Sequence, residues 1–411
     1  RLKPYYEKLM VIDDLADRKH QCDILLDQTF GRQQEDYLTL THEYCKLLLG
    51  SKYALLRAEF AKWRPYSLER RNKSEFKQLL INMGGVDVDN VTENVLDELK
   101  ICNLPNDMNI TIVMGGSAPH LESVKSKAIT LPYKTEVKVD VDNMAEIMAN
   151  SDIAIGAAGS TTWERCCLGL PTIQIITAKN QLFSAETLAH HNIVKLAKEI
   201  KEITYLLESS SEWMKSVGNS ALEICDGMGS YKVFNKMTNY KIILEEFGEV
   251  DLCNYVNLNE NDKILALSMR NHPEINKWMH NQDSIPNATH CEFIKSLENK
   301  IDQRYFLVKQ KSNIIGSINF SEINLYNSVE FGIYTNPFLQ LKGAGRLLES
   351  AASQYAFIEL DVKKIKLEVF SDNERAIHCY NKCGFEIVDT NQVNHQNIMC
   401  MEKMNALEEV E

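Results

Sequence analysis

The sequence has no long apolar run, no pair of cysteines two residues apart and no excess of positive charge. Without a stretch of about 20 apolar residues it holds no candidate membrane-spanning helix, and without a secretory signal we expect a cytoplasmic protein. Its 45 basic and 57 acidic residues give a net charge of −12. That balance argues against nucleic acid or an anionic membrane as partner, because both need concentrated Lys and Arg. An anionic substrate must therefore be held by local donors.

The 11 cysteines are odd in number and scattered along the chain. Cys166 and Cys167 are adjacent within an expected helix, whereas Cys379 and Cys383 are one helical turn apart. Neither spacing is that of a zinc site or a disulfide framework. We interpret the cysteines as small core residues in a reduced compartment, and we expect no metal.

A chain of 411 residues is long enough for two or three domains. It also lacks an initial methionine, and it enters an expected strand near Leu9, so we expect a segment to be missing before Arg1. The basic stretch 62–73, which contains Pro65, is interpreted as a hinge, and residues 245–254 as a domain boundary. The expected division is 1–72, 73–247 and 255–405.

The stretch 153–181 reads as a strand, a turn of small residues, a helix and a second strand. The turn contains Gly159 and Ser160, and the spacing of Thr161 and Glu164 is that of a capping box. Such a unit is typical of a parallel α/β sheet. Its turn leaves backbone N–H groups free at a helix start, where a phosphate or diphosphate is stabilised.

Two earlier units repeat part of this pattern. Strands expected at 78–83 and 110–114 are each followed by a Gly-Gly pair and a helix, which favours a doubly wound sheet. Further helices are expected over 37–48 and 240–247.

The run GSTTWERCCLGLP, together with VIDDLADRKHQCDILLDQ and LLLGSKYALLRAEF, resembles the UDP-sugar hydrolase family of pseudaminic acid synthesis. That family has two facing Rossmann-like halves and is similar to GT-B glycosyltransferases. The resemblance implies that Asn180 contacts the sugar or the attacking water, unless it only caps a helix. It implies that Glu164 holds the ribose hydroxyls, unless the capping box occupies it. The residues implied in substrate binding are Gly159, Ser160, Thr161, Glu164 and Gln181.

The sequence departs from this family in three places. Val86 and Lys179 replace a serine and a glutamate of the family pattern. The family's catalytic histidine lies in an earlier glycine-rich loop, and neither His20 nor His42 matches it. The family mechanism is attack of an activated water on the anomeric carbon with departure of UDP. We therefore expect this chain to hydrolyse its UDP-sugar poorly or not at all.

The C-terminal part carries a second pattern. Alternating strands precede Gln340-Leu341-Lys342-Gly343-Ala344-Gly345-Arg346, and an amphipathic helix follows over 347–358. Glycines let successive N–H groups converge on a diphosphate at a helix start. Further on, Ser371-Asp372-Asn373 is expected to cap a helix over 374–382. The glycine run and SDNERAIHCYNKCGF resemble the GNAT acetyltransferases, in particular the acetyltransferase of the same pathway and less closely ribosomal-protein N-terminal acetyltransferases.

This second resemblance implies acetyl-CoA as the acetyl donor. It places Tyr380 as the phenol that protonates the departing thiolate, two helical turns from Asn373 on the same face. Glu330, Glu368 or a water molecule is the base for the amine. The residues implied in acetyl-CoA binding are Gln340, Gly343, Ala344, Gly345, Arg346 and Asn373.

Together the two resemblances predict an incomplete GT-B-like, two-half Rossmann-like part followed by a mixed α/β GNAT domain. The expected activities are consecutive steps of pseudaminic acid synthesis: N-acetylation of a UDP-amino sugar and release of UDP from the diacetylated product. Three alternatives stay open. The first part is a glycosyltransferase that needs an acceptor, or it only binds the UDP-sugar, or the GNAT part acetylates protein N-termini.

Overall fold

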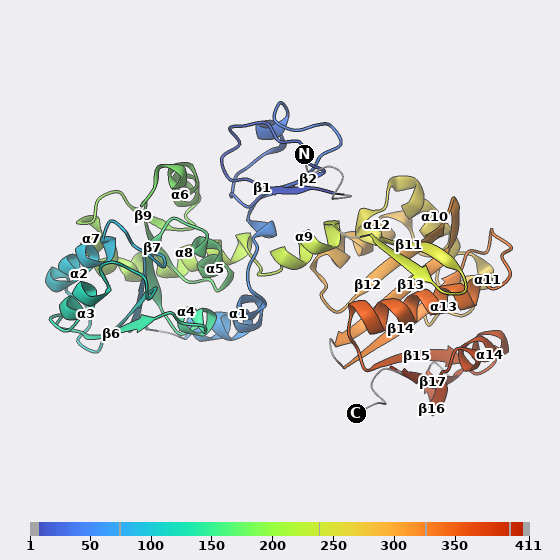
Figure 1. The fold of residues 1–411 in the computed structure, drawn as a ribbon. Helices are drawn as coiled ribbons and strands as arrows, with labels where there is room; N and C mark the ends of the chain where they lie inside the picture. Colours follow the sequence, from blue (N-terminus) through green and yellow to red (C-terminus); the bar gives the residue numbers. More distant parts are fainter. Residues whose placement is uncertain (1–7, 74, 238, 325–326, 394–395, 406–411) are drawn as a thin grey trace. The chain divides into compact units, whose positions relative to one another are not determined.

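A computed structural model describes residues 8–73, 75–237, 239–324, 327–393 and 396–405, and Figure 1 shows the elements that they form. The chain divides into two compact units between Val233 and Phe234. Within the described ranges, no helix combines the length and apolarity needed to cross a membrane.

The first unit begins with a parallel sheet in the order β1-β2-β3, formed by β1 (Met10–Ile12), β2 (Ile24–Asp27) and β3 (Lys46–Leu49). The helix expected over 37–48 was therefore wrong. A short 3₁₀ turn, η2 (Gln34–Tyr37), precedes β3, whose Leu48 pairs with Leu26 of β2. Burial of the leucines against a neighbouring strand overrides their good helix propensity.

The main sheet of this unit is parallel, with the order β6-β5-β4-β7-β8-β9. The chain starts in the middle at β4, winds outward to β6 and returns beside β4 as β7. Helices cover both faces (Figure 1), and each face has its own hydrophobic core. The expected doubly wound sheet is confirmed, and the carboxyl ends of β4 and β7 form the switch point at which such sheets bind ligands.

The strands of this sheet are β4 (Gln78–Asn82), β5 (Asn109–Met114), β6 (Lys134–Val139), β7 (Ile153–Ala157), β8 (Thr172–Ile175) and β9 (Lys195–Ala197). The helices are α2 (Val91–Ile101), α3 (Leu121–Ala128), α4 (Met144–Ala149), α5 (Thr161–Cys167), α6 (Leu182–His190), α7 (Glu202–Glu208), α8 (Ser210–Ile224) and α9 (Gly229–Met237), the last of which crosses the division between the units.

The expected hinge at 62–73 is instead part of a helix, α1 (Ala58–Arg71), which contains Pro65. The basic residues of this stretch hold the helix in place. Arg64 and Arg71 are largely buried and donate to carbonyl groups near the ends of α4, α5 and α8. The hinge prediction failed because hydrogen bonds to carbonyl groups more than 70 residues away hold this helix in place despite its internal proline.

The second unit contains a mixed sheet in the order β10-β11-β12-β13-β14-β15-β17-β16, in which only β14 and β15 pair in parallel. The helix expected over 240–247 was wrong, because this segment enters the hairpin of β10 (Tyr240–Leu244) and β11 (Gly248–Asn254). Ile242 and Leu244 are buried and alternate with exposed residues, as in a strand. The domain boundaries expected from the sequence stay a prediction.

The remaining strands are β12 (Arg304–Gln310), β13 (Asn313–Asn324), β14 (Ser328–Thr335), β15 (Lys364–Phe370), β16 (Glu386–Val393) and β17 (Gln396–Met404). The helices are α10 (Glu260–Arg270), α11 (Pro273–Asn276), α12 (Asn287–Ser296), α13 (Ala344–Gln354) and α14 (Glu374–Lys382), with a π-helical turn, η7 (Tyr355–Glu359), after α13.

Candidate functional sites

The turn after β7 presents backbone donors at the switch point. The amides of Gly159, Ser160 and Thr161 donate to no backbone carbonyl in the described part of the chain. The next two amides are used within the helix start: Thr162 N donates to Gly159 O at 3.0 Å, and Trp163 N to Ser160 O at 3.1 Å. Three donors therefore remain for an anion.

The expected capping box is absent. Ser160 is the residue before the first turn of α5, and no side chain caps that turn. The Thr161 hydroxyl instead accepts a hydrogen bond of 3.0 Å from Arg165 Nη1. Thr161 and Glu164 lie within the helix, so the capping box does not occupy Glu164.

Arg165 lies directly beneath this turn, 1% exposed. Its Nη2 donates to Ala157 O at 2.8 Å, and its guanidinium occupies the space that a side chain on Gly156 would fill. Burial lowers the pKa of Arg165 to about 10, so it is charged at neutral pH. In the described ranges no carboxylate oxygen lies within 4.0 Å of it. An anion on the turn would supply the missing negative charge.

Gln181 is brought to the same turn. Its Oε1 accepts from the Thr177 amide at 2.9 Å, which leaves Nε2 3.9 Å from the position of a Cβ on Gly159. Burial raises the pKa of Glu164, and the charge of Arg57 opposes this. Asn180 is exposed in η4 (Lys179–Gln181), so its contact with sugar or water stays a prediction.

In the second unit, β14 and β15 pair over only three residues each, 328–330 and 364–366. Beyond Glu330 and Lys366 the two strands no longer pair, and this opens the sheet between them. The loop 336–343 follows β14 and leads into α13. Gly343 adopts φ +86°, which other residues rarely adopt, and it starts this helix.

The start of α13 also presents free donors. Within the described residues, the amides of Gly343, Gly345 and Arg346 donate to no backbone carbonyl outside the helix, and their places in its first turn leave them without a partner inside it. Ala344 N donates weakly to Leu341 O at 3.4 Å. Gln340 is exposed on the loop before them. Residues 343–346 thus form the start of α13, and their expected contact with acetyl-CoA stays a prediction.

Helix α14 lies against the start of α13: a Cβ on Gly345 would be 3.6 Å from Cys379 Sγ. Asn373 Oδ1 accepts from Ala376 N at 3.3 Å, so its side chain caps α14, as expected from the sequence. Tyr380 is the next residue on this helix.

Tyr380 is 8% exposed, and its ring centroid lies 6.1 Å from that of Phe331 and 5.7 Å from that of Phe385. Burial, reinforced by Cys379 and Glu349, raises the pKa of Tyr380 well above its ordinary value. The phenol is therefore protonated at neutral pH and has a proton to donate.

Acidic side chains gather where β14 and β15 separate. Burial, followed by the charges of Glu322 and Glu368, raises the pKa of Glu330. Glu368 lies 3.3 Å from His280 Nε2, and the His280 ring is 5.5 Å from that of Phe370. An open hollow of about 520 Å³ lies at the ends of the neighbouring strands, lined by Ser371, Thr390, Asn391, Gln392 and Asn397.

The sequence reasoning missed Arg165 and His280. An arginine directly before two cysteines in a short helix was the available signal for Arg165, whereas nothing in the polar stretch 280–284 marks His280. In the described part of the chain, no group of three or more His, Cys, Asp or Glu side chains is arranged to hold a metal ion.

Two family models match the chain. The glycosyltransferase family 28 C-terminal domain matches residues 79–222, and the acetyltransferase (GNAT) family matches residues 269–385. The two matches fall in different structural units, and they cover the turn after β7 and the start of α13.

Among known proteins, acetyltransferase PseH of Campylobacter jejuni is 39% identical over 140 residues, which are 34% of this chain and 87% of that protein. The C. jejuni UDP-2,4-diacetamido-2,4,6-trideoxy-beta-L-altropyranose hydrolase is 30% identical over 182 residues, 44% of this chain and 62% of that enzyme. An uncharacterised protein of Methanocaldococcus jannaschii is 28% identical over 343 residues, 82% of this chain and 67% of that protein. The last similarity is long enough to extend through both units.

Proposed function

The chain belongs, through its C-terminal part, to the GNAT acetyltransferase family, and on that premise we propose that it N-acetylates the 4-amino group of a UDP-amino sugar in pseudaminic acid synthesis. Acetyl-CoA is the acetyl donor. The observation that carries the proposal is one arrangement: open amides at Gly343, Gly345 and Arg346, the separation of β14 from β15, and a protonated Tyr380 on the helix that contacts the start of α13.

These positions support the following reaction. The free amides hold the diphosphate of the coenzyme, and the gap between the strands admits its pantetheine arm. The neutral amine attacks the thioester carbon, and the C–S bond breaks as the carbonyl re-forms. The departing thiolate takes its proton from Tyr380, which eases that departure.

Acetyl transfer is tested by supplying acetyl-CoA with a UDP-4-amino-4,6-dideoxy sugar and measuring release of free CoA thiol. Peptides with free N-termini serve as the competing acceptor. We expect release with the sugar nucleotide and none above background with the peptides. The opposite preference would favour the alternative of N-terminal acetylation.

We propose Glu330 as the base that takes the proton of the amine. Its pKa is raised by burial, so the carboxyl group gains a proton at a higher pH than an ordinary glutamate and then ceases to act as a base. We expect kcat/KM to fall as the pH decreases through this raised pKa, and Glu330→Gln to remove that acidic limb and lower the rate at neutral pH about 100-fold. Glu368→Gln is the matched variant. If it alone removes the limb, Glu368 is the base.

For the first unit we propose a UDP-sugar site at the turn after β7. The three open amides and the buried charge of Arg165 suit a diphosphate, and Gln181 lies beside them. The chain spans 62% of the length of the C. jejuni hydrolase that it resembles. Hydrolysis of the UDP-sugar by the whole protein is therefore our proposal. Acetylation and hydrolysis on one chain would raise the local concentration of the shared intermediate.

Release of UDP from the diacetamido sugar nucleotide tests this proposal. We expect UDP to bind and turnover to be poor. A full hydrolytic rate from this chain would contradict the expected slow turnover, and turnover only with an added acceptor would indicate a glycosyltransferase. Because UDP-sugars and acetyl-CoA are cytoplasmic metabolites, we propose that the protein is cytoplasmic. We also propose that it acts in a route to a nonulosonic acid that serves flagellin glycosylation.

A further inference from the structure

The hairpin of β10 and β11 contacts the loop assigned to acetyl-CoA. Its tip, residues 245–247, brings Phe247 to the loop, where ring atom Cε1 is 3.9 Å from the position of a Cβ on Gly343. The carbonyl oxygen of Phe247 accepts a hydrogen bond of 2.6 Å from Gln310 Nε2 on β12. The tip is thereby attached both to the loop and to the sheet.

The same tip engages Arg346. The guanidinium forms an ion pair with the Glu246 carboxylate, and its centre lies 5.9 Å from the centroid of the Phe247 ring. Both charged side chains are about half exposed, 50% for Arg346 and 56% for Glu246. Arg346 is the one cationic side chain among residues 343–346.

We propose that Glu246 competes with the diphosphate of acetyl-CoA for Arg346 and thereby sets the affinity of this site for the coenzyme. The inference rests on the function proposed above. A diphosphate on the amides of 343–346 would lie beside Arg346, and its negative charge would either displace Glu246 or be repelled by it. Both effects weaken binding of acetyl-CoA and of the product CoA.

Removal of the Glu246 charge could tighten or weaken binding of the coenzyme, depending on whether Glu246 also orients Arg346 for the ligand. The Phe247 ring lies against the guanidinium independently of the carboxylate, so Arg346 keeps a support when Glu246 is neutral. Loss of competition therefore outweighs loss of orientation. Exposed ion pairs are worth about 0.2–1 kcal/mol, which limits the change in Kd to about fivefold.

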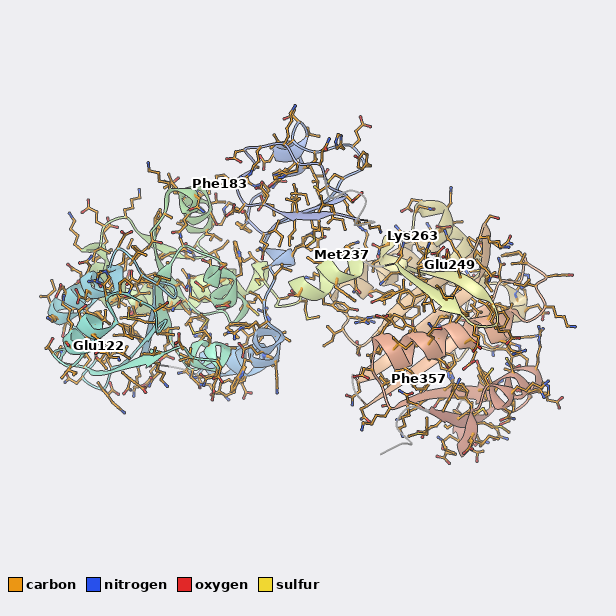
Figure 2. All side chains as sticks on the ribbon, viewed as in Figure 1. Glu122, Phe183, Met237, Glu249, Lys263 and Phe357 are labelled. Atoms are coloured by element: carbon orange, nitrogen blue, oxygen red, sulfur yellow. The ribbon has the colours of Figure 1, made fainter. Side chains whose placement is uncertain are left out.

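The test compares Glu246→Gln with a matched control on the same hairpin. Glu249 also forms an ion pair, at 3.0 Å with Lys241, and its 57% exposure is close to that of Glu246. Glu249 is labelled on β11 in Figure 2. Glu249→Gln therefore makes the same change in net charge at a carboxylate for which no contact with the loop is described.

The Kd of CoA is measured by calorimetry for the unaltered protein and for both variants. We expect Glu246→Gln to bind about two- to fivefold more tightly and Glu249→Gln to be unchanged. The gain should shrink at high salt, and it should vanish when Arg346→Gln is added. S-acetylpantetheine, an acetyl donor without a diphosphate, should show the same KM with the unaltered protein and with Glu246→Gln.

Two results would overturn the inference alone: binding by Glu246→Gln that is no tighter, or equal tightening by Glu249→Gln, which would reflect net charge. Failure of the unaltered protein to bind CoA would instead contradict the acetyltransferase function itself and the inference with it.

Discussion

Replacing Tyr380 by phenylalanine is expected to lower kcat for acetyl transfer about 100- to 1,000-fold while leaving the KM for acetyl-CoA nearly unchanged. The substitution removes only the proton that the thiolate would take. The ring contacts with Phe331 and Phe385 remain. Within the described residues no hydrogen bond of the Tyr380 hydroxyl is found, so its loss strands no partner. Steady-state release of CoA thiol measures the effect.

Stability and specificity controls accompany this variant. The free energy of unfolding of Tyr380→Phe should stay within about 1 kcal/mol of the unaltered protein, because no cavity or unpaired group is created. Tyr355→Phe is the matched control: Tyr355 is also buried, and its hydroxyl accepts from Arg304 at 2.9 Å. It should lose stability and keep its kcat. A kcat for Tyr380→Phe within threefold of the original would mean that water protonates the thiolate.

Replacing Lys403 by methionine is expected to destabilise the second unit by about 2–3 kcal/mol. Glu349, 2% exposed on α13, accepts from Lys403 Nζ at 2.8 Å and from Ser353 Oγ at 2.6 Å. Methionine keeps most of the packing of the lysine stem but leaves the buried carboxylate without its cationic partner. The estimate is at the low end for a broken buried pair because the lysine side chain is 21% exposed.

Loss of acetyl transfer with increasing urea reports on this unit, since tryptophan fluorescence would mix both units. The double variant Glu349→Gln/Lys403→Met should recover to within about 1 kcal/mol, because the glutamine carries no charge. Lys241→Met breaks the exposed pair with Glu249 and should cost less than about 0.5 kcal/mol. If Lys403→Met and Lys241→Met lost acetyl transfer at the same urea concentration, the buried pair of Lys403 with Glu349 would not stabilise this unit as expected.

Several parts of this protein were predictable from neighbouring residues alone. The helix 374–382 and its cap Asn373 were correct because a capping residue and an amphipathic repeat are local signals. The doubly wound sheet was predictable because successive strand–glycine–helix units specify parallel pairing. The glycine-containing starts of α5 and α13 were also predictable from the sequence, because the first amides of any helix have no partner within it.

Other parts depended on partners far away in the chain. The strand at 46–49 forms because it pairs with β2. The helix through Pro65 is held in place because its arginines donate hydrogen bonds to distant carbonyl groups. Arg165 lies beneath the turn after β7, and Glu246 lies beside the start of α13. Each is a single charged residue that belongs to no repeating sequence pattern. The sequence by itself determined which helix starts carry open amides. Only the tertiary structure decided which charges surround those helix starts, because a charge acts through space on whatever folding brings within a few ångströms.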